Sequence, residues 1–122
     1  MGWTYRWRNT VKKYIPSRGD IVYLDFNSTK GHEQYGKRPA IVISNDIFNI
    51  HTGMIIVCPI TSNNKDYPTH YKLEDSFKIH GSVLCEHIRS IDYKTRNVKF
   101  VEKSSDNDYI SVLTLMNACI EE

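Results

Sequence analysis

Residues 39–60 read PAIVISNDIFNIHTGMIIVCPI, and the two apolar runs in this stretch decide the fold. The first run, residues 39–44, is rich in β-branched side chains and predicts a strand. The second run, residues 54–60, is apolar throughout, which is typical of a strand buried on both faces. Residues 45–53 between them are a connector, with one helical turn expected over residues 46–49.

Short strands are also expected on both sides of this stretch. They cover residues 21–26, 69–73, 82–88 and 97–102. The hydrophobic periodicity then changes from that of strands to that of a helix. Ser105 followed by Asp108 resembles a capping box and predicts where this helix starts. The apolar stripe of this helix is expected at Tyr109, Val112, Leu113, Met116 and Ile120. Strands followed by one helix, without alternation, predict a mainly β fold with a C-terminal helix, as a small antiparallel barrel or curled sheet.

The composition is that of one ordinary globular domain. The chain has 122 residues, of which 40% are apolar and 25% are charged. The longest apolar run is too short to cross a bilayer, and no apolar signal segment follows the basic start, so we expect a cytoplasmic protein without membrane contact. Cys58, Cys85 and Cys119 are odd in number and lie among apolar residues, which predicts free, buried thiols.

Positive charge is concentrated at the N-terminus. Residues 1–18 carry a net charge of +5, whereas the rest of the chain carries −3. We therefore divide the chain into an N-terminal extension, residues 1–17, and a single domain, residues 18–122. Trp3 and Trp7 alternate with arginines in the extension, so it either contacts nucleic acid or packs its aromatic rings on the domain.

The loop before the 39–44 strand imitates a phosphate-binding P-loop. Residues 31–37 fit the spacing G-x-x-x-x-G-K, but Arg38 stands where Ser or Thr would bind magnesium. Pro39 also favours extended geometry at Arg38, and a strand follows instead of a helix. We therefore reject nucleotide binding.

The same loop suits the cleavage of RNA. Lys30, Lys37 and Arg38 can meet phosphate oxygens, while Glu33 and His32 lie between them in sequence. RNA cleavage needs a base for the ribose 2′-hydroxyl and cations for the charge that develops on the phosphate. An ordinary solvated polar loop is the alternative explanation of this composition.

Linked motifs along the chain resemble the MazF/PemK toxin family. They are GDIVYLDF at 19–26, TKGHEQ at 29–34, RPAIVISN at 38–45, PIT at 59–61 and EHIRSID at 86–92. The resemblance covers about residues 18–121, in order and with fitting spacing.

This resemblance implies an SH3-like barrel and a homodimeric toxin of a type II toxin–antitoxin pair. It implies metal-independent, sequence-specific cleavage of single-stranded RNA, including mRNA, to 2′,3′-cyclic phosphate and 5′-hydroxyl ends. The catalytic residues would be Arg38, Thr61 and Glu33. Arg38 would stabilise the phosphorane or also protonate the leaving oxygen, Thr61 would hydrogen-bond a phosphate oxygen, and Glu33 would act as the base or orient Arg38. The RNA-binding residues would be Thr29, Lys30, His32, Gln34, Lys37 and His87. A small MazE-like antitoxin is the implied protein partner.

The sequence departs from the family pattern at several positions. His32 and His87 replace a frequent serine and a usual glutamine, while Ser28 and Tyr35 replace a usual proline and a small residue. Because a histidine titrates near neutral pH, His32 or His87 could contribute to cleavage or base choice, or simply form ordinary hydrogen bonds.

Two other functions are alternatives to the ribonuclease. A CcdB-like toxin would have the same fold but would act by binding gyrase, and a decayed domain would only bind RNA or protein. No cofactor and no metal site are expected, since His51, His70 and His80 have no ligand spacing with one another or with the cysteines.

Overall fold

The predicted buried strand is the centre of the fold. It forms β3 (Met54–Thr61) in a computed structural model that describes residues 14–26, 37–63 and 65–121. One edge of β3 pairs with β2 (Lys37–Val42), from Ala40 opposite Pro59 to Val42 opposite Val57. The other edge pairs first with β6 (Arg89–Asp92) and then with β5 (Ser82–Leu84). One long strand therefore pairs with three others, β2 on one edge and β5 and β6 on the other.

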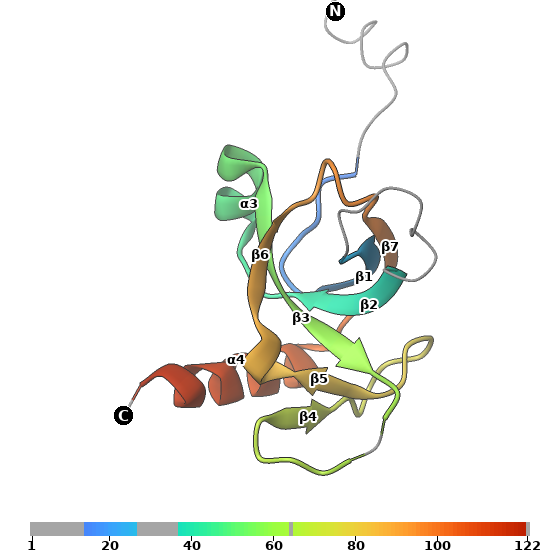
Figure 1. The fold of residues 1–122 in the computed structure, drawn as a ribbon, viewed down its shortest axis with the longest axis vertical. Coiled ribbons are helices and arrows are strands. Elements are labelled where there is room, and N and C mark those ends of the chain that lie inside the picture. Colours follow the sequence, from blue (N-terminus) through green and yellow to red (C-terminus); the bar gives the residue numbers. More distant parts are fainter. Residues whose placement is uncertain (1–13, 27–36, 64, 122) are drawn as a thin grey trace, which may run out of the picture.

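The sheet is antiparallel and strongly curved (Figure 1). Its order is β4-β5-β3-β2-β1-β7, with β6 paired to β3. The remaining strands are β1 (Asp20–Asp25), β4 (His70–Lys72) and β7 (Lys99–Lys103). No pairing in the described part of the chain joins β4 to β7, so the expected barrel is an open, curled sheet.

Side chains of β3 alternate between two hydrophobic clusters. Ile55 and Val57 pack with buried residues of β1 and β2, whereas Cys58 and Ile60 pack on the face covered by the C-terminal helix. This confirms the prediction of burial on both faces, because alternate residues of a strand point to opposite sides of a sheet.

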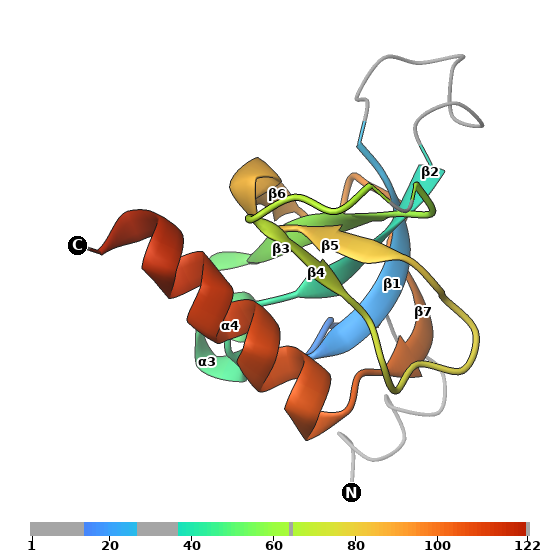
Figure 2. The ribbon, with the colours of Figure 1, turned by 90° about the horizontal axis from the view of Figure 1, so that it is seen from below.

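Helix α4 (Asp106–Ile120) begins as predicted. The Ser105 hydroxyl accepts a hydrogen bond from the Asp108 N–H at 2.9 Å. Val112 and Met116 are buried, with Tyr109 and Leu113 packed beside them, as the helical spacing indicated. Ile120 is 69% exposed, so its inclusion in the stripe was wrong. Figure 2 shows α4 crossing the side of the sheet that carries β4 and β5.

Several boundaries differ from the predicted ones. The strand expected over residues 82–88 ends at Leu84, because the 3₁₀ turn η1 (Cys85–His87) follows and β6 then begins a separate pairing. The single turn expected in the connector is α3 (Asp46–Thr52), capped by Asn45 and ended by Gly53 in the left-handed region. Cys119 is exposed, so the expectation of three buried thiols was wrong, although all three are free. No helix in the described residues has the length and hydropathy to cross a membrane.

Candidate active site

The separation of β2 from β3 opens a pocket of about 390 Å³. Lys37, Arg38 and Pro39 pair with β1 only, because the pairing of β2 with β3 begins at Ala40. Proline suits this free edge because it has no N–H to leave unpaired. The pocket is lined by Tyr23, Arg38, Pro39, Ile60, Thr61, Ser62, Lys78, Ile79 and His80. The structure thus brings together Arg38 and Thr61, two residues that sequence analysis assigned to catalysis.

Cationic and neutral side chains surround this pocket. Arg38 and Lys78 carry positive charge, His80 supplies an imidazole, and no carboxylate occurs among the described lining residues. Arginine and lysine bind phosphate oxygens through charge-assisted hydrogen bonds. The arrangement fits an anionic group and could donate hydrogen bonds to it from Arg38, Thr61 and Lys78.

The loop between β4 and β5 carries Lys78 and is held by a buried carboxylate of β7. Glu102 accepts hydrogen bonds from the N–H groups of Phe77, Lys78 and Ile79 at 2.9, 2.9 and 2.8 Å. Burial raises the pKa of Glu102, but these three bonds and the Lys78 charge outweigh it, so the pKa lies below its usual range. The charged carboxylate therefore fixes the loop at the pocket.

The other end of the same loop packs directly on the end of β3. A Cβ atom on Gly81 would lie 2.1 Å from the carbonyl oxygen of Thr61, and Gly81 has φ +146°. Only glycine accepts both the close approach and the positive φ. His80 is therefore held beside Thr61 by the residue that follows it.

A second, smaller pocket of about 200 Å³ begins at Thr61 and contains His87. Glu86 also lines this pocket and accepts a hydrogen bond from the Thr69 hydroxyl at 2.7 Å, while His70 Nε2 lies 2.9 Å away. Burial opposes the charge of Glu86, but the bonds from Thr69 and His70 prevail and its pKa is lowered. His87 Nε2 lies 3.6 Å from the carboxylate and is largely exposed. His87 thus lines this neighbouring pocket and is not among the residues that line the first.

The remaining predicted residues have different positions. Lys37 is exposed at the start of β2, opposite Asp25. The other candidates lie outside the described residues, and they are Thr29, Lys30, His32, Glu33 and Gln34. Sequence analysis missed Lys78 and His80 as site residues, because no motif links them to Arg38 and only the sheet brings them close.

A larger pocket, about 500 Å³, lies at the opposite end of β1. Its charged lining is mixed, since Asp46 and Asp106 accompany Arg18 and Lys103. Much of that charge is already engaged, because Asp46 accepts from the Arg18 N–H at 2.9 Å and Lys103 contacts Asp20 at 2.9 Å. We therefore assign the candidate site to the smaller pocket with Arg38 and Thr61.

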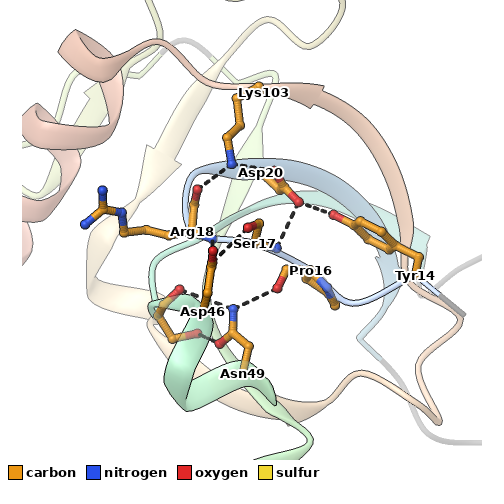
Figure 3. A network of polar contacts seen from close by, with 9 residues as sticks. Tyr14, Pro16, Ser17, Arg18, Asp20, Asp46, Asn49 and Lys103 are labelled. Atoms are coloured by element: carbon orange, nitrogen blue, oxygen red, sulfur yellow. Dashed lines mark hydrogen bonds and ion pairs between the residues drawn. The ribbon is translucent and has the colours of Figure 1, made fainter. Parts of the chain in front are cut away.

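Polar contacts at that opposite end anchor the residues that precede β1 (Figure 3). The Tyr14 hydroxyl donates to Asp20, and the Asn49 side chain donates to the Pro16 carbonyl at 2.9 Å. The Tyr14 ring also meets Phe100 edge-on, with 5.9 Å between ring centroids. Residues 14–17, the described end of the predicted extension, thus pack on the domain, whereas Trp3 and Trp7 lie outside the described residues. In the described residues, no group of three or more His, Cys, Asp or Glu side chains could hold a metal ion.

Known proteins match the chain along most of its length. The sequence model of the PemK-like, MazF-like toxins of type II toxin–antitoxin systems matches residues 17–119. The endoribonuclease toxin MazF of Escherichia coli K12 is 38% identical over 86 residues, covering 70% of this chain and 77% of that protein. The endoribonuclease toxin ChpB of the same strain is 35% identical over 119 residues, covering 91% and 99%.

Solved structures agree with these sequence matches. The crystal structure of MazF from Deinococcus radiodurans has a TM-score of 0.78 and 33% identity, covering 88% of this chain and 98% of that one. A MazE–MazF structure from the same organism matches with a TM-score of 0.77 and 30% identity, covering 88% and 97%. By sequence and by fold, this chain belongs to the PemK-like, MazF-like toxin family of type II toxin–antitoxin systems.

Proposed function

We propose that this chain is a toxin that cleaves single-stranded RNA, including mRNA, at specific short sequences and so inhibits translation and growth. The observation that carries the proposal is the pocket in which Arg38 and Thr61 meet, in a member of a family whose relatives are named endoribonuclease toxins. The match to endoribonucleases favours cleavage over a CcdB-like toxin that acts only by binding.

The reaction needs charge stabilisation at phosphorus. As O2′ attacks, negative charge accumulates on the non-bridging phosphate oxygens, and preorganised donors stabilise it. The Arg38 guanidinium grips two oxygens and remains charged throughout, while the Thr61 hydroxyl donates one further hydrogen bond. Lys78, which also lines the pocket, adds a second cation. These side chains support a cleavage that proceeds without a metal ion or cofactor.

The remaining roles extend the site beyond the described residues. Glu33 takes the proton of the 2′-hydroxyl. The products of the cleavage are a 2′,3′-cyclic phosphate and a 5′-hydroxyl end. Thr29, Lys30, His32, Gln34 and Lys37 bind the RNA on one side, and His87 binds it in the neighbouring pocket. The position of Lys37 beside Arg38, and the contact of both pockets with Thr61, support this path.

The protein acts as a homodimer in the cytoplasm and is neutralised by a cognate MazE-like antitoxin. A related MazF has been solved together with MazE, which supports the antitoxin as a partner. Residues 18–122 form the catalytic domain, and residues 1–17 are an extension of it. The start of the family match at residue 17 supports this division.

The test is cleavage of a long single-stranded RNA in excess EDTA, with the new 5′ ends mapped. We expect discrete cuts with 5′-hydroxyl ends, and their loss in Arg38→Ala. Arg18→Ala is the matched control, because Arg18 is an exposed arginine at the opposite end of β1. Intact RNA with the folded wild-type protein would refute the proposed function and would favour a binding toxin.

A further inference from the structure

We propose that His80 is the general acid of the cleavage reaction and protonates the 5′-oxygen as it leaves. This inference rests on the proposed function and names a catalytic residue within the same pocket. Sequence analysis considered Arg38, His32 and His87 for such a role. Among the described residues that line the pocket with Arg38 and Thr61, however, the one histidine is His80.

His80 is held between two fixed points of the backbone. On one side Gly81 lies so close to β3 that its absent Cβ would fall 2.1 Å from the Thr61 carbonyl oxygen. Ser82, the next residue, pairs with Thr61 in the β3–β5 ladder. The sheet therefore sets the position of the His80 backbone relative to Thr61.

The preceding residues fix His80 from the other side. Ile79 is buried in the core, and its N–H donates to Glu102 at 2.8 Å. The N–H groups of Phe77 and Lys78 bond to the same carboxylate. The backbone of His80 is therefore held on both sides, which limits the positions that its exposed imidazole can take at the pocket. Proton transfer in a transition state requires such a positioned group.

The chemistry of the reaction requires such a group. The bond from O2′ to phosphorus forms while the bond from phosphorus to O5′ breaks, and O5′ takes the bonding electron pair. The proton of the 2′-hydroxyl goes to the base, Glu33 in the proposed function, and O5′ receives a proton from the His80 imidazolium. Arg38 is a poor donor for this step because a guanidinium does not lose its proton in proteins.

The other titratable groups of the described pocket are less suited than His80 to act as the general acid. The titratable and charged side chains of the pocket are Tyr23 from β1, Arg38 from β2 and Lys78 from the loop. Tyrosine and lysine ordinarily titrate near pH 10, whereas a general acid works best with a pKa near the operating pH. Imidazole is the side chain of this kind that titrates near neutrality.

The experiment compares two RNA substrates that differ in one atom. One has the natural 5′-oxygen at the cleavage site, and the other has a bridging 5′-sulfur, whose thiolate leaves without protonation. We expect His80→Gln to cleave the oxygen substrate about 10²- to 10⁴-fold more slowly, the usual contribution of a general acid, and the sulfur substrate less than about 10-fold more slowly. His51→Gln, an exposed histidine on α3, is the matched control and should match wild type on both substrates.

The dependence of the cleavage rate on pH is a second test. A general acid must be protonated, so the wild-type rate on the oxygen substrate should fall as pH rises through the histidine range, and His80→Gln should lack this fall. An equal loss on both substrates would overturn the inference, because His80 would then act in binding or structure. Wild-type rates in His80→Gln would overturn it as well. Neither result touches the proposed function, which fails only when the wild-type protein leaves RNA uncut.

Discussion

The Glu102 carboxylate holds the loop that carries Lys78 and His80, and Glu102→Gln tests how much this hold contributes. Phe77 bonds to one carboxylate oxygen, and Lys78 and Ile79 bond to the other. A glutamine has one carbonyl oxygen, so it can keep two of these bonds without the charge, while its NH₂ group faces the third N–H. Hydrogen bonds to charged groups contribute roughly 1.5–3 kcal/mol and neutral ones about 1 kcal/mol, so replacing three charged bonds by two neutral ones should cost at least about 3 kcal/mol.

Thermal and urea unfolding measure this loss. For a chain of this length, 1 kcal/mol corresponds to about 4 °C in Tm, so we expect Glu102→Gln to melt at least about 10 °C below wild type. Glu74→Gln is the matched control, since Glu74 is exposed and lies in the same loop. The kcat/KM for RNA should also fall in Glu102→Gln, because the loop no longer holds Lys78 and His80 at the pocket.

The contribution of Glu102 to the free energy of unfolding also depends on pH, in a direction set by its pKa. The pKa of Glu102 is lowered by folding, so its stabilisation is complete above the ordinary value of 4.5 and is lost as pH falls through the lowered value. The difference between wild type and Glu102→Gln should therefore shrink in acid. Unfolding free energies that differ by less than about half a kcal/mol at neutral pH, the range of ordinary surface substitutions, would refute the reasoning.

Two further substitutions test the packing around the sheet. Gly81→Ala should cost about 1–3 kcal/mol in urea unfolding and should lower kcat/KM, because a Cβ would clash with the Thr61 carbonyl at a positive φ; unchanged stability would contradict this. Tyr14→Phe should cost about 1 kcal/mol, because Asp20 loses one of its donors. Burial and the bond to Asp20 raise the pKa of Tyr14, so this advantage of wild type should persist to pH 10 and decline above it; a difference that does not change with pH would contradict the assignment.

Local patterns predicted the elements where one physical cause dominates. The apolar run before Thr61 became the central strand because it could be buried on both faces. Ser105 became the cap of α4 because its hydroxyl accepts the free Asp108 N–H. The Asp108 carboxylate turned instead to Tyr71 and to the Glu74 and Asp75 N–H groups, a use that local spacing does not indicate.

Predictions failed where the partner of a segment is distant in sequence. Residues 82–88 have strand composition throughout, yet the chain turns at Cys85 because β3 pairs with β5 at its end and with β6 at its start. Ile120 fits the helical stripe, but no element covers the end of α4 among the described residues. Composition records how buried a residue tends to be, and it does not record which strand edge is free.

The sequence by itself determined the class of fold, because burial patterns depend on neighbouring residues. It also named Arg38, Thr61 and Glu33 as catalytic candidates, through short motifs that resemble those of the toxin family. The tertiary structure decided that β2 leaves β3 at Ala40 and that Arg38 and Thr61 face one pocket. It also brought Lys78 and His80 there, through a carboxylate of β7 and the contact of Gly81 with β3. These positions depend on strand register between distant segments, and register follows from how the whole core packs.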